Sequence, residues 1–419
     1  MFLSKGTTTS CHRCDHLPID AENFENFHNL PKKLADRRLM LEGKWPKASD
    51  PLDLNGCDYC RKIEEAGGMS DRLVHRDAGH LTPPELDKDQ TAVNVTPRIF
   101  EIYFTNVCNL SCLYCGPHFS SKWQNENKRN GEFVSPADES VPAAFRDNLK
   151  FPQFWEGFQP NKNYDQLLKK FWIWLEANAK HLVFLNVLGG EPLYQKEFGQ
   201  ILDVLEKKPA PGLTLVPITN LMVRKEVLQD YFLRLASMVH DGKLKGVNVT
   251  ASLDGWGPEA EFTRSGLDLD LWEKNFTYLL RQRWINMSVN IAINPLTIKT
   301  LPELIRKIKE WRKTRPVAMS FMTVAYPSEM DIDIFGPGVF DEDFKKILDE
   351  MPTENQYDHN YKNYMHGISL QVASAKRKPL ELYKLRIFLD EIDRRRGTNW
   401  RTLFPWLETE LSSIVKESI

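Results

Sequence analysis

Cysteine is absent from most of this 419-residue chain, since none follows Cys115. An excess of charge is absent as well: 55 Lys and Arg stand against 57 Asp and Glu, which gives no electrostatic case for nucleic acid or an anionic membrane as a partner. No apolar run approaches the roughly 20 residues of a membrane span, and no basic segment followed by an apolar run marks a signal peptide. We therefore expect a cytoplasmic protein that keeps its thiols reduced.

The residues that are plentiful are those of a folded protein. Hydrophobic residues make up 42% of the chain and charged residues 27%, and the sequence contains 23 Phe and 11 Trp. Such a chain can bury a substantial core, which argues against disorder. Its length predicts two or three domains.

From residue 98 onward, short apolar runs alternate with amphipathic stretches of helical period. The apolar runs predict strands at Arg98–Phe104, His181–Leu188, Leu213–Thr219, Gly246–Ser252, Met287–Ile293 and Val317–Val324. The amphipathic stretches predict helices at Tyr164–Ala179, Lys196–Lys207, Arg224–Val239, Asp268–Arg283 and Pro302–Arg312. Alternating strands and helices indicate βαβ units and a parallel sheet. Six units are two fewer than in a closed eight-stranded barrel.

We therefore predict an α/β fold class with a partial (β/α)6 TIM-like barrel at residues 98–330. A cysteine-rich module with weak periodicity precedes it at residues 1–97, and we expect this module to depend on something other than a large core. A mainly helical extension follows at residues 331–419. In this extension Leu380–Arg395 predicts a helix that ends at Gly397. A long loop, Gly116–Asn161, interrupts the first βα unit.

The seven cysteines fall into three groups. Their number is odd, so they cannot all pair as disulfides within one chain. Grouped cysteines in a reducing compartment are more often metal ligands than disulfides. The groups are Cys11-x-x-Cys14, Cys57-x-x-Cys60 and Cys108-x-x-x-Cys112-x-x-Cys115.

The third group directly follows the first predicted strand, at the end of a parallel barrel that carries the reactive residues. Three thiolates on one loop can hold three irons of a [4Fe–4S] cluster and leave the fourth iron open to a small ligand. A zinc site or a chance grouping is the alternative for Cys108, Cys112 and Cys115.

Together with later motifs, this loop resembles the cluster loop of radical S-adenosylmethionine enzymes, which carries an aromatic residue at the position of Tyr114. Gly189-Gly190-Glu191 closes the second predicted strand, as does the family motif that holds the methionine amino group. Thr219-Asn220 is similar to a Thr-Asn turn of the family. Ser252 and Arg264 resemble the pair that contacts the ribose and carboxylate of the cofactor in peptide-modifying and protein-modifying members.

The chemistry of these residues agrees with the roles that the resemblance implies. Glycines 189 and 190 let backbone approach a ligand. Glu191 offers an acceptor to a cationic amino group, and Arg264 offers a planar fork to a carboxylate. The alternatives are a simple turn for the two glycines, a solvated acid for Glu191 and a surface base for Arg264.

The resemblance implies a [4Fe-4S] cluster and S-adenosyl-L-methionine as cofactors, and a one-electron donor such as a flavodoxin or ferredoxin as a partner. In such enzymes the reduced cluster cleaves S-adenosylmethionine, and the resulting 5′-deoxyadenosyl radical abstracts a hydrogen atom from substrate. The outcome is an oxidation, a crosslink or an epimerisation, typical of an oxidoreductase or an isomerase. No motif identifies a catalytic acid or base.

Cys11, Cys14, Cys57 and Cys60 suffice for a second site, although the gap between the two pairs exceeds the roughly 15–20 residues usual for zinc. The segment around Cys57 and Cys60, from Gly56 to Gly68, resembles the twitch module of a radical S-adenosylmethionine subgroup. Asp393–Trp400 resembles the tail of that subgroup. In the better-known members the twitch or SPASM module follows the barrel, whereas here it precedes it. An auxiliary iron–sulfur cluster and a structural zinc both remain open.

For the substrate, we expect a peptide or protein side chain. A small metabolite or modified nucleotide is the alternative for an enzyme. The non-enzymatic alternative is a zinc protein that binds nucleic acid or a partner. The basic run Arg394–Arg396 either lies on a solvated helix face or meets an anionic partner.

Overall fold

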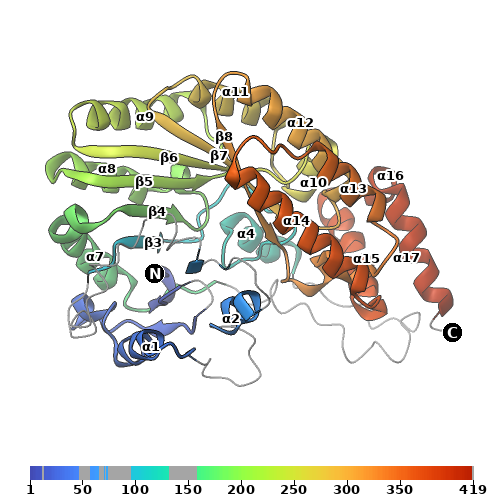
Figure 1. Ribbon diagram of the computed structural model, residues 1–419, viewed down its shortest axis with the longest axis horizontal. Coiled ribbons are helices and arrows are strands. Elements are labelled where there is room, and N and C mark those ends of the chain that lie inside the picture. Colours follow the sequence, from blue (N-terminus) through green and yellow to red (C-terminus); the bar gives the residue numbers. More distant parts are fainter. Residues whose placement is uncertain are drawn as a thin grey trace.

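The computed structural model describes residues 1–11, 14–46, 57–65, 70, 72–73, 96–131 and 158–417. In these residues, a six-stranded parallel sheet with the order β3-β4-β5-β6-β7-β8 forms the centre of the molecule (Figure 1). The α/β class and the partial barrel predicted from the sequence are confirmed. The strands are β3 (Ile99–Tyr103), β4 (Phe184–Leu188), β5 (Ala210–Thr219), β6 (Leu244–Ser252), β7 (Ile285–Ile293) and β8 (Val317–Thr323).

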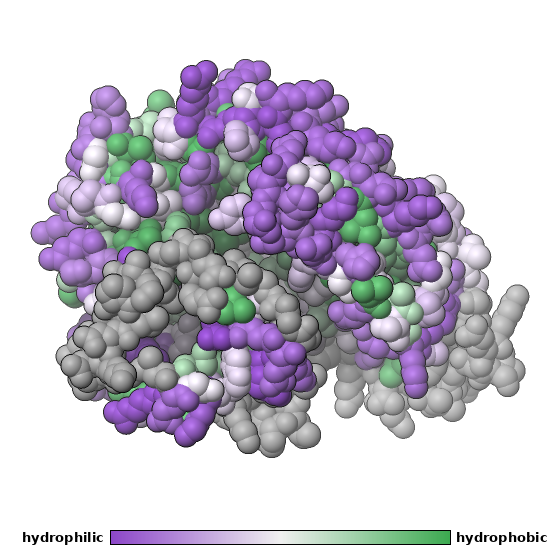
Figure 2. Space-filling model, in the orientation of Figure 1, coloured by the Kyte–Doolittle hydropathy of each residue, from purple (hydrophilic) through white to green (hydrophobic). Residues whose placement is uncertain are grey.

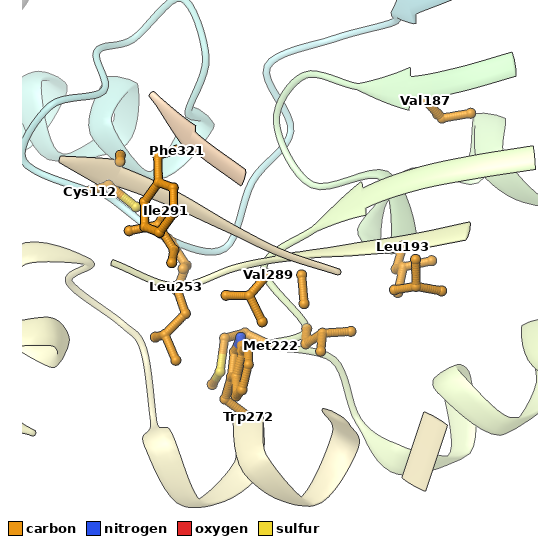
Figure 3. Packing of buried hydrophobic residues seen from close by; sticks show 14 of the residues in the cluster. Cys112, Val187, Leu193, Met222, Leu253, Trp272, Val289, Ile291 and Phe321 are labelled. Atoms are coloured by element: carbon orange, nitrogen blue, oxygen red, sulfur yellow. The ribbon is translucent and has the colours of Figure 1, made fainter. Parts of the chain in front are cut away.

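Helices connect the strands and cover one face of the sheet. They are α7 (Tyr164–Asn178), α8 (Lys196–Lys207), α9 (Lys225–His240), α11 (Leu269–Leu280) and α12 (Leu301–Arg312). The covered face carries alternate side chains of each strand; for example, Phe100 of β3 stacks on Phe171 of α7 and packs at a tilt against Trp174 of the same helix. Figure 3 shows Trp272 of α11 beside Val289 of β7 in the same core. The outer surface of α11 and α12 is predominantly hydrophilic (Figure 2), as expected for amphipathic helices.

The opposite face of β6, β7 and β8 is polar and partly exposed. Because the strands pair in register, Ser252, Asn290 and Ser320 form one row across the three strands, and Ser320 Oγ donates to Asn290 Oδ1 at 2.9 Å. In the next row Ser288 Oγ hydrogen-bonds Thr250 Oγ1 at 3.0 Å. Each of these five side chains is intermediate in burial. This face therefore offers uncharged hydrogen-bonding groups along three strands.

The N-terminal segment differs from the prediction, because part of it joins the core of the barrel. It contains a short antiparallel pair, β1 (Thr7–Thr8) and β2 (Leu17–Pro18), and the helices α1 (Pro31–Leu41) and α2 (Asp58–Glu65). Phe27 is 2% exposed and packs against Phe100 and Trp174. Phe2 stacks on Tyr103 at 4.2 Å between ring centroids. Scattered aromatic residues, which show no periodicity in the sequence, make these contacts.

The helical C-terminal region is confirmed. Its helices are α13 (Asp341–Glu350), α14 (Gln356–Ser374), α15 (Pro379–Arg396), α16 (Trp400–Leu403) and α17 (Pro405–Glu417). Gly397 ends α15 with a φ of 66°, in the left-handed region that favours glycine. Within the described residues, no helix combines the length and apolar character needed to cross a membrane.

The long loop predicted for Gly116–Asn161 is partly helical, since α4 spans Ser121–Asn130. This helix is difficult to see in the sequence because it is mostly polar and Trp123 is its one large apolar residue. Residues 132–157, with Phe133, Phe145 and Phe154, lie outside the described part of the chain.

Candidate functional site

The cysteine loop begins after β3 and is held by two neighbouring segments. Val107 O accepts a hydrogen bond from Glu191 N at 2.8 Å, which ties the loop to the end of β4. On its other side, Ser111 N donates to Ser265 O at 2.9 Å and Leu113 N donates to Thr263 O at 2.8 Å. These residues lie at the end of the short helix α10 (Pro258–Thr263) and just after it. Backbone hydrogen bonds thus fix the loop from β4 and from the segment that follows β6.

The three thiols of the loop lie within electrostatic reach of one another. Burial, together with the neighbouring Cys112, raises the pKa of Cys108 to about 12. A side-chain hydrogen bond links Cys112 and Cys115, raising the pKa of Cys115 and lowering that of Cys112. Cys112 is buried and the other two are partly buried. Three thiolates this close repel one another, so the ionised set requires a compensating positive charge. An iron–sulfur cluster supplies it, and the donor set therefore fits such a group.

Gly189 and Gly190 have left-handed backbone conformations, with φ of +82° and +57°. A Cβ at Gly190 would overlap the carbonyl oxygen of Val107, and one at Gly189 would meet the ring of Tyr103. The two glycines therefore allow the end of β4 to approach β3 and the cysteine loop, a position that a side chain would prevent.

Glu191 is 1% exposed and connects the ends of β4 and β5. Its Oε1 accepts from Thr219 Oγ1 at 2.6 Å and from Leu193 N at 3.1 Å, while its Oε2 accepts from Asn220 N at 2.6 Å. Burial raises its pKa to about 7, although these three donors oppose the rise. Glu191 is therefore not a solvated acid. Its carboxylate holds the Thr219-Asn220 turn against the glycine turn.

Asn220 extends this network to the cysteine loop. Its Nδ2 donates to Asn109 Oδ1 at 3.0 Å and lies 3.9 Å from Cys108 Sγ. Asn109 in turn donates through Nδ2 to Met222 O at 2.5 Å. The turn after β5 also contains a non-glycine residue with positive φ, Leu221 at 55°. Residues 108–109 and 220–222 thus form one hydrogen-bonded unit.

Arg264 binds a carboxylate, as its geometry suggests, but that carboxylate belongs to Asp254 of the chain itself. Arg264 Nε and Nη2 donate to Asp254 Oδ2 and Oδ1 at 2.8 and 3.0 Å. Tyr114 OH donates to Asp254 Oδ2 at 2.5 Å, and Ala292 N donates to Asp254 Oδ1 at 2.9 Å. The Arg264 side chain is 8% exposed and that of Asp254 is fully buried, so Arg264 is not a surface base.

Asp254 is the site residue that sequence reasoning missed. It lies two positions after Ser252, and an acidic residue at a strand end next to an expected Arg could have indicated the pair. Through Asp254, the Tyr114 hydroxyl joins the cysteine loop to the segments after β6 and β7. Burial raises the pKa of Tyr114, so its hydroxyl stays protonated well above neutral pH.

Ser252 ends β6 beside this network and lies on the polar face of the sheet. The structure thus brings the motifs after β3, β4, β5 and β6 to one edge of the sheet. The sequence-predicted residues at this edge are Cys108, Cys112, Tyr114, Cys115, Gly189, Gly190, Glu191, Asn220, Ser252 and Arg264.

The four N-terminal cysteines come together from two segments far apart in the sequence. Cys11 Sγ and Cys14 Sγ are 3.4 Å apart, and Cys14 also hydrogen-bonds Cys57. Cys60 is electrostatically coupled to Cys57 and lies in the first turn of α2. Gly56 and Gly68, which belong to the twitch-like segment, lie outside the described residues.

Across the described part of the chain, no three or more His, Cys, Asp or Glu side chains are arranged to hold a single metal ion. The ligands of a cluster bind different irons and spread further apart than the ligands of one ion. Electrostatic coupling links the three thiols of the loop, and sulfur contacts link the N-terminal cysteines.

No protein-family model and no curated protein matches this chain. Several solved structures resemble it weakly, among them the following three. A crystal structure of Streptococcus suis SuiB bound to S-adenosylmethionine is 14% identical, covers 88% of this chain and 67% of that chain, and gives a TM-score of 0.36. A TYW1 structure with a lysine-pyruvate adduct bound is 10% identical over 70% and 87%, with a TM-score of 0.31. A second Streptococcus suis SuiB structure is 15% identical over 75% and 69%, with a TM-score of 0.31. Scores of this size do not establish kinship, so the functional assignment depends on the residues of this chain.

Proposed function

We propose that this chain is a radical S-adenosylmethionine enzyme. The observation that carries the proposal is the meeting of four motifs, which follow four successive strands, around three cysteines at one sheet edge. Chance occurrence of each motif would not link them by hydrogen bonds in which Asn220 N donates to Glu191 and Asn220 Nδ2 donates to Asn109 of the cysteine loop. In parallel α/β barrels, this edge is where the catalytic residues lie.

In this proposal Cys108, Cys112 and Cys115 hold a [4Fe–4S] cluster. When bound and reduced by a donor such as flavodoxin or ferredoxin, this group supplies one electron that splits S-adenosylmethionine into methionine and the radical that takes a hydrogen atom from substrate. The chain itself orients the reactants and excludes water. Glu191 and Asn220 fix the turns that face the cysteines, and the Asp254–Arg264 pair fixes Tyr114.

We assign the cofactor contacts to Tyr114, Gly189, Gly190, Glu191, Asn220, Ser252 and Arg264. With positive φ and no Cβ, the two glycines let the end of β4 approach the cysteine loop closely. Because Glu191 and Arg264 already have partners within the chain, we assign them to positioning as much as to direct contact.

For the substrate, a peptide or protein side chain remains our proposal. The support is the uncharged, partly exposed rows of β6–β8, since peptide groups are neutral and both donate and accept hydrogen bonds. A small metabolite or modified nucleotide is the alternative. At Cys11, Cys14, Cys57 and Cys60 we propose an auxiliary iron–sulfur cluster, with zinc as the alternative.

The test is anaerobic reconstitution with iron, sulfide and a strong reductant, followed by metal analysis and chromatography of 5′-deoxyadenosine. We expect a brown protein that cleaves S-adenosylmethionine. A variant with Ala at positions 108, 112 and 115 should lose cleavage. The matched variant with Ala at positions 11, 14, 57 and 60 should keep part of it. A colourless zinc protein without 5′-deoxyadenosine would favour the non-enzymatic binding protein and contradict the proposal.

A further inference from the structure

The C-terminal end of α15 packs against α4, the helix that directly follows the cysteine loop. The start of α4 is bonded to that loop. Ser121 Oγ donates to Cys108 O at 3.2 Å, and Ser120 Oγ donates to Leu110 O at 2.5 Å. Ser120 Oγ also accepts from Trp123 N at 3.2 Å as the N-cap of the helix. A shift of α4 would therefore move the cysteines.

Trp123 connects the loop with the C-terminal region. Its side chain is fully buried, and its Nε1 donates to Cys112 O at 2.8 Å. The guanidinium of Arg396, at the end of α15, lies 4.6 Å from the centroid of its ring, in range of a cation–π interaction. The same indole thus contacts a cluster ligand through its N–H and a buried cation through its ring.

Arg396 is paired with Glu126, which lies one helical turn after Trp123. Arg396 Nε donates to Glu126 Oε2 at 3.2 Å, and the two side chains are 10% and 8% exposed. The side chain of its neighbour Arg395 is fully buried and donates to Asn127 Oδ1 at 2.8 Å and Gly131 O at 2.9 Å. The basic run expected on a solvated helix face therefore has two buried members that bind α4.

The rest of the tail motif fixes the end of α15. Asp393 accepts from Thr398 Oγ1 at 2.6 Å and from Trp400 N at 2.9 Å, and Gly397 supplies the left-handed turn between them. These contacts close the chain back on α15 and set the position of the preceding arginines. The segment Asp393–Trp400 is thus organised around the contact with α4.

A purely structural ion pair explains this arrangement poorly. Burying two charges costs desolvation energy, and well-packed apolar residues often stabilise as much as a buried pair. The location of the pair suggests a role at the cysteine loop. Arg396, like Lys122 and Arg264, is electrostatically coupled to Cys112. Reduction adds negative charge to a cluster, and a fixed cation in a low-dielectric interior favours the more negative state.

We propose that Arg396, with Glu126 and Trp123, positions the cysteine loop and sets the reduction potential of the cluster that the loop holds. The inference rests on the proposed function, because it assumes a cluster at Cys108, Cys112 and Cys115. Arg396 raises the potential, and Glu126 limits its effect. This assigns the C-terminal motif to control of electron transfer at the cluster, as a group of positioning residues.

The test is an EPR-monitored redox titration of the reconstituted full-length protein. The titration monitors the EPR signal of the reduced cluster, identified as the signal that changes when S-adenosylmethionine is added. Arg396→Met should lower the midpoint potential, and Glu126→Gln should raise it. Arg396→Lys should remain near the wild type. Arg394→Met is the matched control, because Arg394 is in the same run but its side chain is 59% exposed; it should not shift the potential.

Opposite shifts for Arg396→Met and Glu126→Gln are the decisive result, because a general loosening of the fold would move both potentials in one direction. Unchanged potentials in both, or shifts of the same sign, would overturn the inference while leaving the proposed function intact. If Arg396→Met does not fold, as judged by circular dichroism, the Glu126→Gln shift decides. Failure of the proposed function is distinct, since the wild type would then show no signal that responds to S-adenosylmethionine.

Discussion

Replacement of Asp254 by Asn should destabilise the protein strongly, because it removes one charge of a buried pair. Asp254 is fully buried, and it accepts hydrogen bonds from Arg264 Nε and Nη2, Tyr114 OH and Ala292 N. Breaking a buried ion pair by removing one partner costs about 3–5 kcal/mol. Since Asn retains the shape and one acceptor oxygen, we expect a loss of about 3 kcal/mol in the free energy of unfolding.

Urea denaturation of the wild type and the variant measures this loss. Asp203→Asn is the matched control, because Asp203 pairs with Arg234 at 2.7 Å but its side chain is 56% exposed; such surface pairs contribute at most about 1 kcal/mol. Asp254→Asn combined with Arg264→Met should recover part of the loss, since no unpaired charge then remains buried. A loss for Asp254→Asn no larger than that for Asp203→Asn would show that water reaches Arg264, and would refute the reasoning.

Three further predictions concern other contacts of the site and core. Gly190→Ala forces a side chain against Val107 O at positive φ, so it should lower the free energy of unfolding, measured with urea, by about 1–3 kcal/mol. The control Gly212→Ala should lower it little, because Gly212 has open space around it. Burial raises the pKa of Glu191 to about 7, so its contribution to stability is present below its ordinary pKa and lost as pH rises through 7. The free energy of unfolding should therefore decline between pH 5 and 8, and Glu191→Gln should remove up to ~3 kcal/mol of this decline. An identical pH profile for the wild type and the variant would contradict the prediction. Phe27→Ala should cost about 3–5 kcal/mol in the same assay, and a loss below about 1 kcal/mol would mean that the N-terminal segment is not part of the core.

Much of the barrel could be predicted from the sequence because its strands and helices have clear periodicity. The helix predicted at Lys196–Lys207 has those bounds in the structure, and Gly397 ends α15 as its position indicates. Other predicted elements differ mainly at their ends, where local sequence and tertiary contacts compete. α4 was not predicted, because its burial depends on Arg395 and Arg396 from a remote part of the chain.

At the candidate site, the residues could be predicted more readily than their partners. Arg264 is predicted because, with Ser252, it resembles the cofactor-contacting pair of the family, and the sequence does not reveal that a carboxylate of the chain itself reaches it. In the structure, the return of the chain after α10 places Arg264 against Asp254. For the N-terminal segment, too, the sequence does not reveal the contact partners, since Phe27 packs against Phe100 and Trp174, which are remote from it along the chain.

These partners change how the cysteine loop is understood. A loop with three cysteines could be a flexible segment that a cluster alone organises. Here Glu191, Asn220 and Tyr114 connect it to the ends of three other strands, and Trp123 connects it to α4. Because each connection comes from a different element, the loop is held from several directions by residues that are not metal ligands. Such a preorganised loop lowers the conformational cost of binding a cluster, and leaves its properties sensitive to buried charges in the elements that hold it.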